Sequence, residues 1–95
     1  RINASAPGLR CERFKIRQQN ITDAATTVVG TSEQSEFGGA IVQSRSHIAG
    51  TFTIAGAKVF EIQMRATTGF VDGLGQATGF GDVEVYAMAE IQKIG

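Results

Sequence analysis

Apolar and polar residues alternate along two segments near the C-terminal end of the chain, residues 58–65 and 83–92. A period of two over this length is typical of half-buried antiparallel strands. We expect the apolar faces of the two strands to be buried, most simply against each other. The first face comprises Phe60, Ile62 and Met64, and the second comprises Val83, Val85, Ala87, Ala89 and Ile91.

Residues 11–19 alternate in the same way. Phe14 and Ile16 fall on one face, while three cations, Arg13, Lys15 and Arg17, fall on the other. The pattern predicts a strand with one buried face and one basic, exposed face.

Three further stretches favour strands over helices. Residues 21–31 are rich in β-branched side chains, residues 40–44 form a short apolar run, and residues 47–56 alternate again. We expect 47–56 and 58–65 to form a hairpin around the glycine break at 55–57.

Short strands punctuated by glycines recur along the chain, and no window keeps the spacing of a helix. The sequence therefore predicts an all-β, antiparallel β-sandwich of about six to eight strands. Residues 1–10 contain the one proline, Pro7, among small residues. We expect them to be an irregular lead-in or linker, followed by a single domain over residues 11–95.

Charge narrows the choice of partners. The 95 residues include nine basic and nine acidic ones, so the formal net charge is zero. Binding to a nucleic acid needs a surplus of Lys and Arg, and we expect no nucleic-acid partner. Apolar runs are short, which predicts no insertion in a membrane. A near-neutral, small domain without disulfides gains buried area by oligomerising.

Candidate catalytic chemistry is sparse, which predicts a protein that is not an enzyme and has no cofactor or metal. Cys11 is the one cysteine and is expected to be a free thiol. His47 is the one histidine, and a strand would place Ser44 and Ser46 on the opposite face from it. We interpret the carboxylates of the two alternating segments, Glu61, Glu84 and Glu90, as solvated charges.

The glycine-rich loop over residues 67–82 is the candidate ligand site. Its aromatic rings can stack on a sugar, its polar side chains can bond to hydroxyl groups, and its glycines let a ligand approach the backbone. The alternative is that the two phenylalanines fold back and close the end of the sandwich. The candidate ligand-binding residues are Phe70, Asp72, Gln76, Phe80 and Asp82. On the polar face of the last strand, Tyr86 and Met88 form a second apolar surface, which we assign to an oligomer interface.

The second half of the chain resembles the small β-sandwich domains that end bacteriophage tail fibres, tailspikes and other virion-attached fibres. The likeness lies in a strand, a glycine-rich loop and a closing strand, although the closing strand lacks the aromatic residue that often stands near its end. The matching residues are Lys58, Phe60, Glu61, Ile62 and Gln63, then Gly81, Glu84, Val85, Tyr86, Glu90 and Ile91.

The resemblance implies a jelly-roll-like sandwich, similar to tumour necrosis factor modules, that assembles as a parallel homotrimer. It also implies a virion protein, made in the host cytoplasm, whose partners are other virion proteins and a host-surface glycan. The expected function is non-enzymatic: attachment to the host surface, or a trimerisation cap. The alternative is a carbohydrate-binding accessory domain on a polysaccharide-degrading tailspike.

Overall fold

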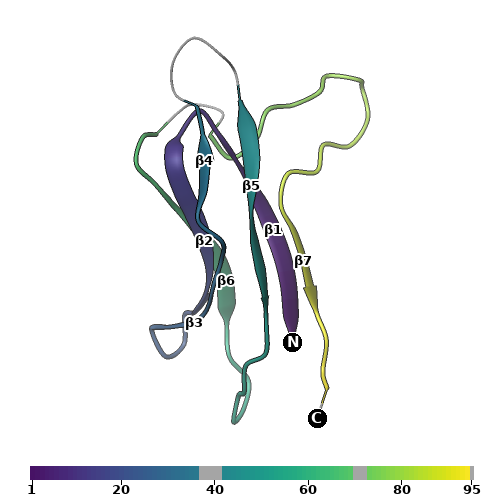
Figure 1. Cartoon of the computed structure of the whole chain (residues 1–95). Helices are drawn as coiled ribbons and strands as arrows, with labels where there is room; N and C mark the ends of the chain where they lie inside the picture. Colours follow the sequence, from purple (N-terminus) through teal and green to yellow (C-terminus); the bar gives the residue numbers. More distant parts are fainter. Residues whose placement is uncertain (37–41, 70–72, 95) are drawn as a thin grey trace.

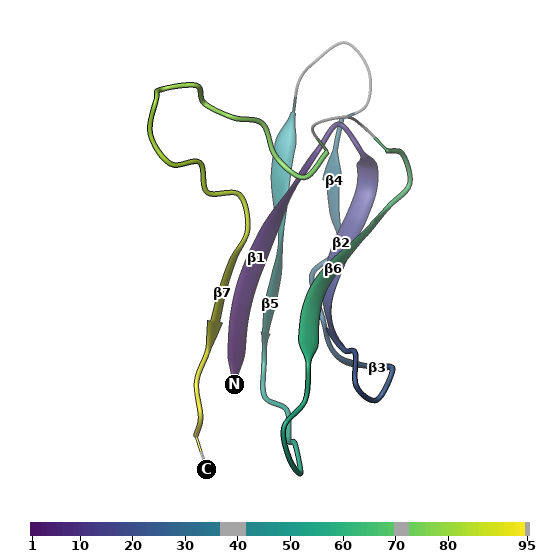
Figure 2. The same ribbon diagram turned by 180° about the vertical axis from the view of Figure 1, so that it is seen from behind.

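The computed structural model describes residues 1–36, 42–69 and 73–94, and within them the protein is all-β with no helix. Two antiparallel sheets face each other, which Figures 1 and 2 show from opposite sides. The prediction of an all-β, antiparallel protein is confirmed. The described strands are β1 (Ile2–Leu9), β2 (Glu12–Asn20), β3 (Ala25–Val29), β4 (Glu33–Ser35), β5 (Gln43–Gly50), β6 (Phe60–Ala66) and β7 (Met88–Ile91).

The first sheet has three strands in the order β5-β1-β7. Strand β1 pairs with β5 over its whole length, from Ile2 opposite Gly50 to Leu9 opposite Gln43. Its other edge pairs with β7 over only four positions, from Ile2 opposite Ile91 to Ser5 opposite Met88. The second half of this edge of β1 therefore has no strand beside it among the described residues.

The second sheet is built around β2. Strand β6 pairs with β2 from Phe14 to Asn20 along one edge. Strand β4 pairs with the beginning of β2, from Glu12 to Phe14, and β3 pairs with its end, from Arg17 to Asn20. Because β6 already occupies one edge of β2, both strands must lie along the other edge. A register shift between Gln18 and Gln19 marks a bulge in the pairing with β3.

The core lies between the two sheets. Phe14 and Ile16 of β2 are buried, whereas Arg13, Lys15 and Arg17 are exposed, so the predicted alternation of this strand is confirmed. Ile62 and Met64 of β6 are only partly buried, although both pack against the core. The buried core cluster comprises Ile2, Ala4, Ala6, Ile16 and Ile48.

The prediction that residues 1–10 are an irregular lead-in is wrong. Residues Ile2–Leu9 form the central strand of the three-stranded sheet and supply much of the core. Small residues are what this position requires: a Cβ atom added at Gly8 would lie 2.7 Å from the ring of Phe14. The low strand propensity of the segment is overridden by its pairing on both edges.

The predicted hairpin between residues 47–56 and 58–65 is also wrong. Strand β5 ends at Gly50 in one sheet, and β6 begins at Phe60 in the other. Residues 51–59 therefore cross from one sheet to the other. The predicted strand at 40–44 lies partly outside the described residues, and that at 21–31 is shortened to β3 because residues 21–24 form a turn.

One side of the sandwich is closed by side chain to backbone hydrogen bonds. The buried hydroxyl of Ser46 in β5 donates to the Thr31 carbonyl at 2.6 Å and accepts from the Ile16 amide at 3.2 Å. Gly30 N in turn donates to Ile16 O, and Thr31 N donates to His47 O. These bonds join the two sheets through the segment between β3 and β4.

The opposite side, where β6 and β7 form the sheet edges, is open. Strand β7 contacts β1 and no other described strand. Both ends of the chain lie at the lower end of the molecule, next to each other (Figure 1). There, Gln92 N donates to Arg1 O and the Arg1 nitrogen donates to Gln92 O, both at 2.8 Å.

Candidate functional site

The segment leading to β7, residues 73–87, swings away from both sheets (Figures 1 and 2). Its base is anchored, because Leu9 N donates to Gly73 O at 2.9 Å and Arg45 donates to Tyr86 O at 2.6 Å. Gly75 has a φ of 128°, and a Cβ atom there would lie 2.6 Å from the ring of Tyr86. Glycine is therefore required at this position both for the backbone and for the packing of the tyrosine.

The outer part of this segment is held by Glu84. Its carboxylate accepts hydrogen bonds from the backbone of Thr78 at 3.0 Å and of Gly79 at 3.1 Å, and also from the Thr78 hydroxyl. These bonds stabilise the charged form and lower the pKa of Glu84 below its ordinary value, with the Thr78 amide contributing most. This role of Glu84 could not be predicted from the sequence, since Glu84 falls within a regular polar–apolar alternation.

The predicted ligand-binding residues in this segment face solvent. Gln76, Phe80 and Asp82 are all exposed, and Phe80 is 82% exposed between two glycines with positive φ, Gly79 and Gly81. The alternative that Phe80 folds back to close the sandwich is therefore wrong. The other two predicted residues, Phe70 and Asp72, lie outside the described residues.

The apolar alternation of the last segment does not lead to burial. Val83 and Val85 are 85% and 67% exposed, and only Met88–Ile91 pairs as a strand. The prediction of a buried face packed against β6 is wrong for this segment, because it bends away from β1 before residue 88. Tyr86, predicted on the outward face, is instead half-buried, and Met88 is 64% exposed.

Within β7, the direction of the side chains is informative. Ile91 lies directly opposite Ile2, and cross-strand partners point to the same face of a sheet. Ile2 is buried in the core, so Ile91 lies on the core side of its sheet, yet it is 63% exposed. No described strand of the other sheet covers it.

An apolar cleft opens on the same side of the sandwich. Its volume is about 690 Å³, and it lies between the partly buried side chains of β6 and the base of the 73–87 segment. The apolar lining includes Ala6, Ile16, Ile62, Met64, Leu74 and Tyr86. We call the cleft, together with the exposed residues Val83, Val85 and Ile91, the open side.

Groups with catalytic potential are dispersed. Cys11 is buried and free, with its sulfur 3.5 Å from the Ser35 hydroxyl. Ser46 is buried whereas His47 is exposed, so the predicted separation of the serines from the histidine is confirmed. Among residues 1–36, 42–69 and 73–94, no three His, Cys, Asp or Glu residues are grouped in a way that could hold a metal ion.

No helix of the described chain is long and apolar enough to cross a membrane. No protein-family model, curated protein or solved structure matches this chain.

Proposed function

We propose that this chain is a non-enzymatic structural module of a bacteriophage fibre or spike, which assembles as a homotrimer in the virion and serves in host-surface attachment or as a trimerisation cap. The observation that carries the proposal is the open side of the sandwich. There, Val83, Val85 and Ile91 are exposed on an otherwise near-neutral domain.

An assembly of copies gives these residues the cover that the single chain lacks. Ile91 points to the core side of its sheet, where a buried neighbour is expected but no described strand lies. Burying a side chain of this size is worth about 1.5–3 kcal/mol. Exposed apolar patches are typical of interaction sites in proteins.

The trimer and the jelly-roll-like arrangement rest on the resemblance of residues 54–91 to fibre domains, together with this surface. Met88, which is exposed in β7, would lie at the subunit contact in this trimer. Tyr86 packs on Gly75 within its own chain, so in the trimer it would support the contact from within the subunit. In this proposal the chain is made in the host cytoplasm. Other virion proteins would then bind to the ends of the trimer.

The test is the molar mass in solution. At micromolar concentration we expect multi-angle light scattering to give three times the chain mass for the wild type and one chain mass for Val85→Lys. The matched control is Val29→Lys, since Val29 is 58% exposed but lies in β3, away from the open side. A monomeric wild type, or equal dissociation of both variants, would refute the proposal; circular dichroism checks that each variant is folded.

A second candidate function is a carbohydrate-binding accessory domain. It is favoured by Phe80, an exposed ring at the end of a turn that Glu84 holds in place. An exposed aromatic ring is suited to stacking on a sugar, and the exposed side chains of Gln76 and Asp82 in the same segment are suited to its hydroxyls. A trimer would add avidity to three weak sites.

A glycan array with wild type and Phe80→Ala tests this second function. If Phe80 binds a sugar, the alanine variant loses binding to the array. Its melting temperature is unchanged, because Phe80 is mostly exposed and its removal uncovers little apolar surface. No array signal for the wild type would rule the function out.

A further inference from the structure

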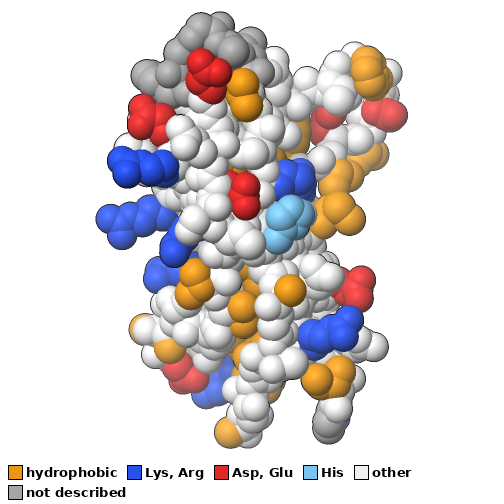
Figure 3. All heavy atoms as spheres, in the orientation of Figure 1, with side chains coloured by type: hydrophobic (Ala, Val, Ile, Leu, Met, Phe, Trp, Pro, Cys, Tyr) orange, Lys and Arg blue, Asp and Glu red, His pale blue; other side chains and the backbone are white. Residues whose placement is uncertain are grey.

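The outer face of the second sheet carries a concentration of positive charge. Arg13, Lys15 and Arg17 of β2 point outward at alternate positions, and Arg65 of β6 lies on the same face. We call these four residues the basic face. They are four of the nine cations of a chain whose net charge is zero. Figure 3 shows Lys and Arg side chains gathered along the left edge of the molecule.

The register brings like charges together on this face. Lys15 lies directly opposite Arg65 across the β2–β6 pair. Like charges at such positions are destabilising, since the two side chains are only about 5 Å apart at their Cβ atoms. A bound anion would remove this repulsion.

No ion pair neutralises the basic face, although one carboxylate, that of Glu61 in β6, lies on the same side of the sheet. Within the described parts of the chain, none of the four cations forms an ion pair, and the pair that does form joins Lys58 to Asp23 elsewhere. Arg17 donates to Gln63 at 2.9 Å and to Thr26 at 3.0 Å, both of which are neutral. The charge of the face is therefore available to a partner from outside.

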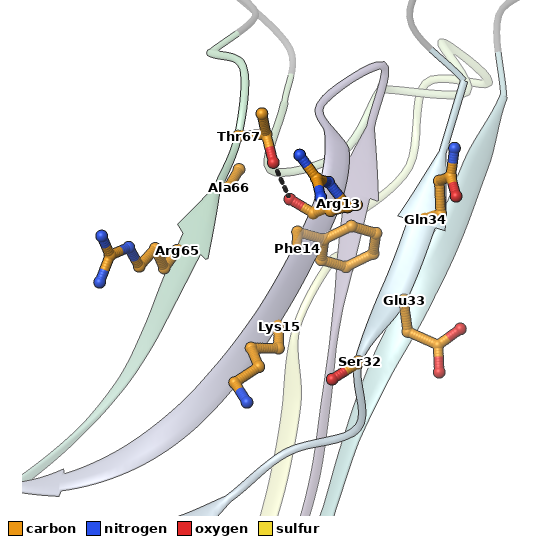
Figure 4. A pocket seen from close by; sticks show the side chains of 9 residues that line it. All are labelled: Arg13, Phe14, Lys15, Ser32, Glu33, Gln34, Arg65, Ala66 and Thr67. Carbon is orange, nitrogen blue, oxygen red and sulfur yellow. Dashed lines mark hydrogen bonds between the residues drawn. The ribbon is translucent and has the colours of Figure 1, made fainter.

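The surface between these side chains is hollowed. One open depression of about 810 Å³ is lined by three cations, Arg13, Lys15 and Arg65, and by one acidic residue, Glu33, all of which Figure 4 shows. A second depression of about 340 Å³ is lined by Lys15, Arg17 and Arg65. Because they share Lys15 and Arg65, the two form one track that follows β2 past all four cations.

We propose that this track binds a linear acidic polysaccharide. Alternate residues of a strand are about 6.6–6.8 Å apart, so the three cations of β2 span about 13 Å in a straight row. An extended chain with recurring carboxylate groups can contact such a row at several points. The inference goes beyond the proposed function, since it does not depend on assembly or on the exposed Phe80.

A polysaccharide fits the track better than a nucleic acid does. Binding of single strands without sequence preference uses exposed aromatic rings on which bases stack. The aromatic residue that lines the track, Phe14, is 3% exposed and faces the core.

The test uses polygalacturonate, a linear chain of carboxylated sugars, with neutral dextran as the comparison polymer. We expect calorimetric titration at low ionic strength to show binding of polygalacturonate alone, weakening as salt is added. The double variant Lys15→Gln/Arg65→Gln should bind at least about tenfold more weakly, because it removes half of the charged contacts. Its melting temperature should be unchanged or raised, since the like-charge pair is gone.

The control is the double variant Arg1→Gln/Lys93→Gln, which removes the same charge from exposed positions next to β7. It should change the affinity less than about threefold, because these cations lie outside the track. Three results would overturn the proposal: no binding of polygalacturonate by the wild type, an equal loss in both double variants, or tighter binding of single-stranded DNA than of polygalacturonate.

Discussion

Gln18 is the most unusual residue of the core, and its replacement is a sharp test of the structure. It lies in β2 between Val28 and Ile62 of the neighbouring strands and is fully buried. Neither its Nε2 nor its Oε1 atom has a hydrogen-bond partner among the described residues. An amide in this state costs about 1–3 kcal/mol of stability.

Gln18→Met removes both polar atoms with little change in volume or shape. We therefore expect the free energy of unfolding to rise by about 1–3 kcal/mol. For a domain of this size, each kcal/mol raises the melting temperature by about 4–8 °C. Urea titration and calorimetry at one fixed protein concentration measure the two quantities, since assembly would make stability depend on concentration.

Gln34→Met is the matched control, because Gln34 is exposed in β4 on the outer face of the same sheet. It should change stability by less than about 0.5 kcal/mol. A loss of stability in Gln18→Met would refute the reasoning, since it would mean that the amide of Gln18 is hydrogen-bonded in the folded protein.

Two further outcomes follow from single side chains. Since hydrogen bonds depress the pKa of Glu84, their contribution to stability is complete above the ordinary glutamate value of 4.5 and is lost as the pH falls through the lower, folded-state pKa. In an NMR pH titration, the amide resonances of Thr78 and Gly79 should shift with a midpoint below 4.5. This shift should be lost in Glu84→Gln and kept in the control Glu90→Gln. A midpoint at or above 4.5 would contradict the prediction. Ser46→Ala removes the partner of the buried Ile16 amide and of the part-buried Thr31 carbonyl, and should cost about 2–3 kcal/mol in urea titration. The control Ser44→Ala removes one bond at the surface and should cost less than about 1 kcal/mol; equal costs would argue against a bridging role for Ser46.

Strand β2 could be predicted from the sequence because its two faces meet different environments. The core on one side selects Phe14 and Ile16, and solvent on the other side selects the cations. Strand β1 could not be predicted in this way. Its inward residues Ala4 and Ala6 carry little hydrophobic signal, and Pro7 usually marks a break. Packing against the ring of Phe14, which no local pattern reveals, is what makes Gly8 suitable here.

The last segment shows the opposite limit. Its alternation correctly indicates extended chain with one apolar face, but alternation does not reveal which surface covers that face. In the single chain, Val83 and Val85 remain largely exposed. The candidate site could not be predicted for a similar reason. The turn that presents Phe80 is held by the carboxylate of Glu84, which bonds to the amides of Thr78 and Gly79, six and five residues earlier in the chain.

The position of the two ends also determines how the domain responds to force. Strands β1 and β7 are antiparallel neighbours, and Arg1 and Gln92 bond to each other at the end of their ladder. Tension applied between the two ends acts parallel to the hydrogen bonds that join β1 and β7. The bonds therefore break one pair at a time, in an unzipping geometry, and are not loaded all at once in shear. Strand β7 would detach first at low force, while β1 stays paired with β5. A force applied between β7 and the segment that joins β3 to β4 would instead be transmitted through the core. There, Ser46 joins the two sheets by hydrogen bonds.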